Sequence, residues 1–367
     1  MKTTHILTAS AAVLCAFTLL PGRVHAAALA YTVTDLGTLG GNTSQGDGIN
    51  ASGQVAGYAD TSSGYAHAAL WTGTTRTDLG TLGGHNSQGI SINASGQVAG
   101  SSSTTGGSAN HAVRWTGTTP TDLGTLGGSI SNGLGINASG QVAGSSGLAN
   151  GFYHAVRWTG TTPTDLGTLG GNESAGYAIN DSGQVAGYAE GTATSAHHAT
   201  RWTGTTPTSL GSIGGTSSEA YGINASGQVA GYCYITGESY FHAVRWTGTT
   251  PTDLGTLGGN YSKAFGINDA GDVTGMAAIV GGTDSHAFLY TGGTMYDLNN
   301  LLVPGTGVTR LTFDYRGNNI NNLGQIAVYG TIGIQSHALL LTPTPEPTSA
   351  ALLLYGGALL ALRRRRA

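Results

Sequence analysis

The chain has 367 residues, of which 63 are glycine, and it carries 14 Lys and Arg against 18 Asp and Glu. Four of the arginines stand in the last five residues, so residues 31–342 hold 17 Asp and Glu against seven Arg and one Lys. This acidic balance repels phosphate backbones and anionic headgroups, which argues against a nucleic-acid partner and limits membrane contact to the terminal segments. Of the two cysteines only Cys233 lies beyond residue 26, so a chain without its N-terminal segment has no internal disulfide.

Residues 1–26 have the order of charge and apolarity that is typical of a secretory signal peptide. Lys2 supplies the positive charge at the start, residues 6–20 are mostly apolar, and small residues ending at Ala26 form the cleavage site. A second cut site follows Ala30. We therefore expect export and cleavage by signal peptidase.

From residue 31 to 342 the chain is an array of one repeated unit. A DLG motif recurs every 43 or 44 residues, with a double interval where its Asp is replaced. The motif positions are Asp35, Asp78, Asp122, Asp165, Asp253 and Asp297, with Ser209 in the same slot. A period in the forties is typical of propeller repeats, in which each unit supplies about four short strands.

Four strand segments recur in each unit, as the copy between residues 122 and 167 illustrates. A first strand ends at residues 135–137, and residues 141–144, 154–158 and 164–167 are predicted to be the second, third and fourth. The Asn137-Ala-Ser-Gly140 link predicts a hairpin turn, because Gly accepts the left-handed conformation there. Side chains alternate along a strand, so we expect both faces of each sheet to pack on neighbouring units.

The two ends of the array complement each other. Residues 31–36 match a fourth strand and residues 337–341 match a third, so together they complete one unit. We therefore predict an all-β, seven-bladed β-propeller of ~44-residue four-stranded repeats, closed by its terminal strands. The alternative is an open β-solenoid, which would need polar capping repeats that the sequence lacks. The last copy has nine extra residues near positions 303–305, which we expect to bulge from one blade.

A histidine starts the third strand of every copy. These histidines are His67, His111, His154, His198, His242, His286 and His337. Imidazole is a common metal ligand, but equivalent positions of a propeller lie too far apart to share one ion. We therefore expect each His to bond to a neighbouring strand, and we expect no metal or cofactor site. Arg114, Arg157 and Arg245 are candidates for pairing with the Asp across the second hairpin.

The variable loops of the repeats predict a binding face. Loops between the second and third strands open on the same side as the links to the next blade, and both vary among copies. Their aromatic residues are Tyr58, Tyr65, Phe152, Tyr153, Tyr188, Tyr232, Tyr234, Tyr240 and Phe241. Such side chains suit sugar rings or partner proteins, although they also serve simply to pack loops.

Catalysis is the less favoured prediction. The carboxylates that stand outside the repeat pattern include Glu173, Glu190, Glu219, Glu238, Asp284 and Asp314. A glycosidase needs two such groups close together, and nothing in the sequence brings any two of them together. No catalytic residue is therefore assigned.

The C-terminal residues 343–367 combine three features. Pro345, Glu346 and Pro347 precede a short apolar helix predicted over residues 348–362. This segment is shorter than the roughly 20 residues of an ordinary membrane span. Arg363, Arg364, Arg365 and Arg366 follow it and would hold that end on the cytoplasmic side.

The order of these features resembles the PEP-CTERM sorting signal of Gram-negative bacteria. The resemblance implies transient anchoring in the inner membrane and processing near Pro-Glu-Pro by an exosortase-type enzyme. The protein would then reach the cell surface or the extracellular space. An ordinary C-terminal anchor helix is the alternative.

The repeats resemble those of the extracellular HAF-repeat proteins. The likeness rests on DLGTLGG, GIN, GQVAG and the literal His286-Ala287-Phe288, and it covers about residues 31–342. It implies an exported repeat protein with no established chemistry. We therefore expect a structural or interaction module rather than an enzyme, with an extracellular polysaccharide or matrix protein of a biofilm matrix as its partner. The alternative is a polysaccharide-active propeller hydrolase or lyase.

Overall fold

The computed structural model describes residues 29–344, except 108, 193–195, 238, 282–283 and 314–316. The expected signal peptide and the sorting residues 345–367 lie outside these described residues. Within the described part, no helix is long and apolar enough to cross a membrane.

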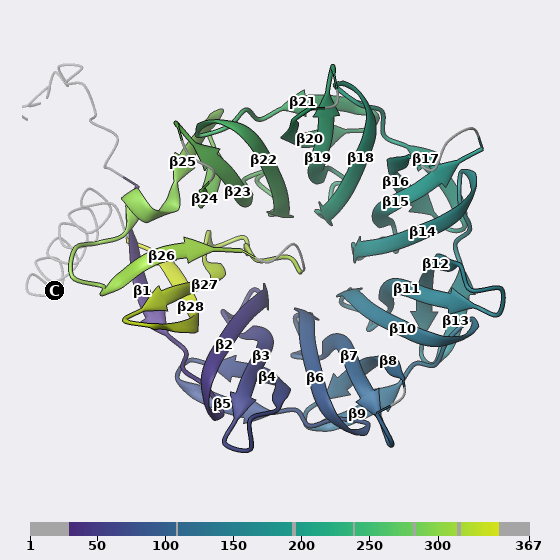
Figure 1. Cartoon of the computed structure of the whole chain (residues 1–367), viewed down its shortest axis with the longest axis horizontal. Coiled ribbons are helices and arrows are strands. Elements are labelled where there is room, and N and C mark those ends of the chain that lie inside the picture. The colour runs from purple at the N-terminus through teal and green to yellow at the C-terminus, as the bar shows by residue number, and fades with distance from the viewer. Residues whose placement is uncertain are drawn as a thin grey trace, which may run out of the picture. The chain divides into compact units, whose positions relative to one another are not determined.

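The described chain forms seven antiparallel four-stranded sheets in a ring (Figure 1). This is the predicted seven-bladed β-propeller, and the ring rules out the open β-solenoid. In each sheet, or blade, the first strand lies nearest the central axis and the fourth lies at the outside (Figure 1). We call the face that carries the second-to-third-strand loops and the links between blades the upper face.

The strand bounds repeat closely from blade to blade. Blade 1 contains β2 (Gly40–Ile49), β3 (Val55–Thr61), β4 (Ala66–Thr72) and β5 (Thr75–Asp78). Blade 2 contains β6 (Gly83–Ile92), β7 (Val98–Thr104), β8 (Asn110–Thr116) and β9 (Thr119–Asp122). Blade 3 contains β10 (Gly127–Ile136), β11 (Val142–Leu148), β12 (Tyr153–Thr159) and β13 (Thr162–Asp165). Blade 4 contains β14 (Gly170–Ile179), β15 (Val185–Gly191), β16 (His197–Thr203) and β17 (Thr206–Ser209).

The remaining blades follow the same order. Blade 5 contains β18 (Gly214–Ile223), β19 (Val229–Ile235), β20 (Phe241–Thr247) and β21 (Thr250–Asp253). Blade 6 contains β22 (Gly258–Ile267), β23 (Val273–Ile279), β24 (Ser285–Thr291) and β25 (Thr294–Asp297). Blade 7 contains β26 (Val308–Thr312), β27 (Ile326–Ile332), β28 (Gln335–Pro343) and β1 (Tyr31–Asp35).

Blade 7 closes the ring by joining the two ends of the array, as predicted. Strand β1 pairs antiparallel with β28 from Tyr31 opposite Pro343 to Asp35 opposite Leu339. The imidazole Nδ1 of His337 lies 2.9 Å from a carboxylate oxygen of Asp35, 302 residues away in sequence. The strand order β1-β28-β27-β26 therefore matches the other blades, although its outermost strand comes first in the chain.

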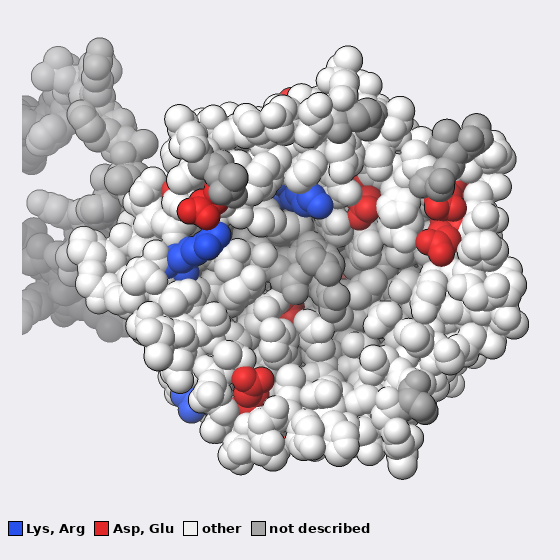
Figure 2. Space-filling view, in the orientation of Figure 1, with Lys and Arg blue, Asp and Glu red and all other residues white. Residues whose placement is uncertain are grey.

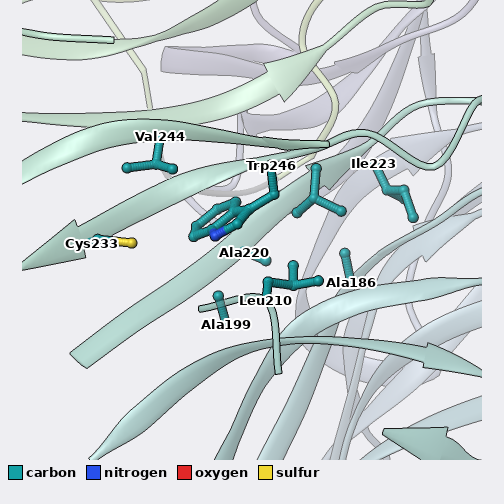
Figure 3. Packing of buried hydrophobic residues seen from close by; sticks show 9 residues of the cluster. Ala186, Ala199, Leu210, Ala220, Ile223, Cys233, Val244 and Trp246 are labelled. Carbon is teal, nitrogen blue, oxygen red and sulfur yellow. The ribbon is translucent and has the colours of Figure 1, made fainter. Parts of the chain in front are cut away.

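The hydrophobic core is divided among the interfaces between blades. Figure 3 shows one such cluster, in which Ala186 and Ala199 of blade 4 meet Val244 and Trp246 of blade 5. Small side chains thus cover one face of a blade and large side chains cover the other. The same pairing of Ala with Val and Trp recurs between blades 1 and 2 and between blades 2 and 3. This asymmetry is the physical origin of the strict repeat, because every blade must fit both neighbours.

Glycine is required at one position of the second strand, where the backbone of the first strand comes very close. A Cβ on Gly144 would lie 1.8 Å from the carbonyl oxygen of Asn132. The equivalent glycines of five other blades, at positions 57, 100, 187, 231 and 275, would bring a Cβ within 2.0 Å of a backbone oxygen. This contact explains the Gly that ends each GQVAG-like segment.

A ring of asparagines joins the blades on the lower face. In each blade an Asn begins the turn between the first and second strands, and its side-chain oxygen accepts hydrogen bonds within that turn. In blade 3, for example, Asn137 Oδ1 accepts from Gln141 N at 2.9 Å. Its amide also donates to the backbone oxygen of the corresponding Asn in the next blade, as in Asn137 to Asn180 at 3.2 Å. The donors are Asn50, Asn93, Asn137, Asn180, Asn224, Asn268 and Asn321.

The extra residues of the last copy form two features. A single 3₁₀ turn, η1 (Leu298–Leu301), follows β25, capped by the side chain of Asp297. Beyond β26, Asn318 bonds to the first strands of both neighbouring blades. Its backbone oxygen accepts from Ile49 N at 3.1 Å, and its side-chain oxygen accepts from Ile267 N at 3.1 Å. The irregular copy therefore ties blade 7 to both of its neighbours, blades 1 and 6, in addition to the expected bulge.

Candidate functional site

The repeated histidines make structural contacts, as predicted, in six of the seven blades. In each case Nδ1 lies 2.7–2.9 Å from a carboxylate oxygen of the DLG aspartate. That Asp also accepts from the backbone N–H two residues on, as in Gly167 N to Asp165 at 2.8 Å. In blade 4 the slot holds Ser209, so His198 has no such carboxylate opposite it.

The prediction that Arg114, Arg157 and Arg245 pair with these aspartates is wrong. The register places Asp165 opposite Val156, whose neighbour Arg157 points to the other face of the sheet. Each Arg instead reaches the next blade, where its guanidinium donates to the backbone oxygen of Gly140, Gly183 or Gly271 at 2.8–3.1 Å.

The nine aromatic residues of the predicted binding face are not all in loops. Tyr58, Tyr153, Tyr188, Tyr232, Tyr234 and Phe241 lie within strands. The prediction ended each second strand too early, because repeat identity stops at GQVAG although the ladder of hydrogen bonds continues. Only Tyr65, Phe152 and Tyr240 lie outside the strands, and they expose 41%, 38% and 44% of their surface. Tyr232 is buried, with 6% exposed.

One pair of positions differs strongly among otherwise similar blades. The first member lies four residues into the second strand, and the second member is its partner on the first strand. Blade 2 has Ser101 opposite Gln88, whereas blade 5 has Tyr232 opposite Glu219. Blade 6 has Met276 opposite Lys263, the lysine of the array. The fold therefore accepts neutral residues here, and the charges of blades 5 and 6 are not a structural requirement.

Glu219 is the centre of a hydrogen-bonded group between blades 4 and 5. Its Oε1 lies 2.8 Å from Nδ1 of His197, and its Oε2 accepts from the Tyr221 hydroxyl at 2.7 Å. The carboxylate side chain is only 11% exposed, whereas that of His197 is 32% exposed. The carboxylate is thus held in place, and His197 is the more accessible member of the pair.

Lys263 completes this group from blade 6. Its ammonium nitrogen lies 4.2 Å from the ring centroid of Tyr232 and 4.8 Å from that of Phe241. Cation–π contacts of this kind gain strength as the cation loses water. We call His197, Glu219, Tyr221, Tyr232 and Lys263 the Glu219 cluster.

The electrostatics of the Glu219 cluster favour the charged forms of Glu219 and His197. Burial alone would raise the pKa of Glu219, but the hydrogen bonds from His197 and Tyr221 outweigh burial and lower it. The hydrogen bond to Glu219 raises the pKa of His197 against the opposing effect of burial. Burial lowers the pKa of Lys263, and the charge of Glu219 opposes that change. Burial, followed by the charge of Glu219, raises the pKa of Tyr221.

Further carboxylates lie near this cluster on the upper face. Burial raises the pKa of Tyr188 to about 12, with added contributions from Glu173, Glu219 and Glu190. Figure 2 shows this face, on which charged side chains are few and an acidic group lies at the right over blade 4. The structure therefore brings together three of the carboxylates that the sequence could not. Glu190 also accepts a backbone bond from Asn172 N at 3.2 Å, whereas Glu238 and Asp314 lie outside the described residues.

Aromatic rings extend the cluster across three blades. Neighbouring ring centroids in this series lie 3.8–6.1 Å apart. The series runs through Tyr177, Tyr188, His197, Tyr221, Tyr232, Tyr234, Phe241, Tyr261 and Phe265. The structure thus joins four of the nine predicted aromatic residues, and it leaves those of blades 1 and 3 apart.

Sequence analysis missed His197, Tyr221 and Lys263 as members of a site. The signal for all three was that they stand at positions which differ from copy to copy. His197 precedes the repeated His, where other copies have Ala66 or Asn110, and Lys263 stands where Gln88 stands in blade 2. Comparing the copies position by position would have found them.

Comparisons with known proteins find distant similarities. No family model and no curated protein matches the chain. A solved structure titled as a putative TolB from Agrobacterium tumefaciens is 11% identical, with a TM-score of 0.43, over 70% of this chain and 80% of that one. A Xanthomonas campestris gluconolactonase is 10% identical, with a TM-score of 0.40, over 86% and 95% of the two chains. The Aleuria aurantia lectin is 12% identical, with a TM-score of 0.37, over 87% and 95%.

Proposed function

We propose that this protein is an extracellular interaction module that binds a carbohydrate polymer through the upper face of blades 4–6. One observation carries the proposal: side chains that depart from a nearly uniform repeat converge in the Glu219 cluster and the aromatic series around it. Blades 2 and 3 show that the fold stands without them.

The chemistry of the cluster suits sugars. Burying a carboxylate and an ammonium group costs free energy that neutral residues at the same positions avoid. Aromatic rings offer flat apolar area together with polar tips, and charged groups beside them bond strongly to hydroxyls. Tyr240, which is 44% exposed, and His197, whose side chain is 32% exposed, are the residues of this region that a ligand would touch first.

The cellular setting of the proposal comes from the sequence. The signal-peptide pattern of residues 1–26 and the resemblance of residues 343–367 to a PEP-CTERM tail support export and surface sorting. At the cell surface the module would meet extracellular polysaccharide, which is the partner that we propose. Intact-mass measurement of the protein released by its host should therefore find a chain without Arg363 to Arg366.

Glycan binding tests the proposal directly. The full-length chain should bind a defined subset of polysaccharides on a glycan array, and Tyr240→Ala or Lys263→Gln should reduce that binding at least about tenfold. Thr161→Ala, in a turn of the opposite face, is the matched control and should bind as the wild type does. Absence of binding to any glycan, or an equal loss in the control, would overturn the proposal.

A catalytic role is the second candidate, and the pairing of His197 with Glu219 favours it. A carboxylate on Nδ1 orients an imidazole and increases its basicity, leaving Nε2 to move a proton. Release of reducing ends or of unsaturated sugars from a bound polymer, lost in both His197→Gln and Glu219→Gln, would establish a hydrolase or lyase. Binding without any turnover would favour the interaction module over a catalytic role.

A further inference from the structure

A polar pocket lies on the upper face between blades 1 and 2, well away from the Glu219 cluster in the ring. Its volume is about 340 Å³, within the range of roughly 300–1,000 Å³ that is usual for small-molecule sites. The lining residues are Tyr58, Ala66, Asn86, Ser87, Gln88, Ser101, Ser102 and Asn110.

The pocket occupies the same place in the repeat as the Glu219 cluster. Blade registers make Ser101 equivalent to Tyr232 and Gln88 equivalent to Glu219. In the same way Ala66 corresponds to His197. Between blades 4 and 5 these larger side chains fill the space between neighbouring blades. Between blades 1 and 2 the smaller residues leave it open, so the cavity follows directly from the substitutions.

The lining offers hydrogen bonds and carries no formal charge. Neither Lys, Arg, Asp nor Glu lines the pocket. In the described part of the chain, the Ser101 hydroxyl and the side-chain amide of Asn110 make no hydrogen bonds of their own. Asn86 accepts from Ala66 N at 3.1 Å through its oxygen, which leaves its NH₂ group as a donor.

Aromatic surface stands in and beside the pocket. The Tyr58 ring is fixed by its hydroxyl, which donates to Gln45 Oε1 at 3.1 Å. Next to the pocket residues Ala66 and Asn86, the rings of Tyr65 and His85 stack with centroids 4.6 Å apart. Tyr65 is 41% exposed, so part of this stacked pair is open to solvent beside two of the lining residues.

We infer that this pocket binds one uncharged, hydroxyl-rich ring, that is, a neutral monosaccharide unit. Amide and hydroxyl groups match both the donors and the acceptors of sugar hydroxyls, while the aromatic rings cover the apolar face of the sugar. A charged sugar would have to leave water without an opposite charge to receive it. The inference shares its ligand class with the proposed function and rests on it in that respect, but it concerns a different site.

Filling the pocket is a test that preserves the fold. Ser101→Tyr introduces the residue that blades 4 and 5 already hold at this position, as Tyr188 and Tyr232. Ser145→Tyr makes the same change in blade 3, where the side chain does not line the pocket, and is the matched control. Saturation-transfer NMR on the full-length chain would use methyl glycosides of glucose, galactose and mannose, with glucuronate as the charged probe.

At least one neutral glycoside should bind, and Ser101→Tyr should weaken it at least about tenfold while Ser145→Tyr leaves it unchanged. Equal binding of glucuronate, or an unchanged signal in Ser101→Tyr, would overturn the inference. If polymers still bind through the Glu219 cluster in that case, the pocket alone is refuted. If the chain binds neither polymers nor monosaccharides, both this inference and the proposed function are refuted.

Discussion

The side-chain amide of Asn321 donates a hydrogen bond to the backbone oxygen of Asn50 at 3.0 Å, across 271 residues of sequence. This bond completes a circle of seven equivalent bonds, each joining one blade to the next. The same amide donates to Gln325 Oε1 at 2.9 Å, so each Asn organises its own turn and holds its neighbour. The Asn that stabilises the turn of each blade therefore also connects that blade to the next one.

We predict that Asn321→Ala lowers the free energy of unfolding by about 1–3 kcal/mol, because it leaves buried polar groups without their partner. Asn137→Ala, in the middle of the array, should cost a similar amount, since its bonds are equivalent. Urea unfolding followed by tryptophan fluorescence measures both. A much smaller cost for Asn321→Ala would show that the seam between the last and first blades is open in solution.

Deleting residues 337–341 should lower the melting temperature far more than removing residues 345–367. The deletion removes the partner of β1 and leaves strand edges of blade 7 unpaired. Differential scanning calorimetry of the two shortened chains makes the comparison. Equal losses would contradict closure by the terminal strands.

The pair of His197 and Glu219 should make stability depend on pH. Because the folded-state pKa of His197 is raised, its contribution is full below the ordinary value of 6.5 and fades as pH rises through the folded pKa. Because the folded-state pKa of Glu219 is lowered, its contribution is present above 4.5 and is lost as pH falls through the folded pKa. The pair should therefore stabilise most between these two values.

The measurement compares urea unfolding of the wild type and His197→Gln at about pH 5.5 and about pH 8.5. The loss caused by the substitution should be larger at the lower pH. His198→Gln is the control, since His198 faces Ser209 rather than a carboxylate. A loss that is the same at both pH values would mean that the pair does not form in solution.

Cys233 should be inert in the folded protein. Its side chain is fully buried in the cluster of Figure 3, and burial raises the pKa of its thiol to about 12. A thiol reagent should therefore label position 233 only as fast as the protein unfolds, which peptide mass spectrometry can follow during a urea titration. Cys233→Ala should cost little stability, because blades 1 and 4 hold Ala59 and Ala189 there. Rapid labelling without denaturant would contradict this packing.

The fold was predictable because its determinants repeat or lie at the two ends. Seven copies of the motif set the number of blades, and the complementary half-units at residues 31–36 and 337–341 implied the closure. The turn at Asn137 was also predictable from local chemistry. The bond from Asn137 to Asn180 was not predictable, because it depends on how two blades pack against each other. The sequence of a single repeat does not contain that information.

The candidate site was not predictable from the motif, because its residues are the ones that break the motif. His197 and Glu219 stand 22 residues apart on different blades, and only the packing of β16 against β18 brings them together. The aromatic residues were found, but six of nine were assigned to loops, although they lie on strands. The length of the second strand could not be predicted, because the strand continues beyond the residues that are identical in the repeats.

The pairing of β1 with β28 also governs when this protein can fold. Asp35 is made near the start of synthesis, yet its partner His337 follows 302 residues later. Six blades can assemble in order as the chain emerges, whereas the seventh must wait for the last strand. Bringing such distant segments together makes the final step slow, and until then strand edges remain open to other chains. A chaperone that shields β1 during export would thus act on the one segment that cannot find its partner early.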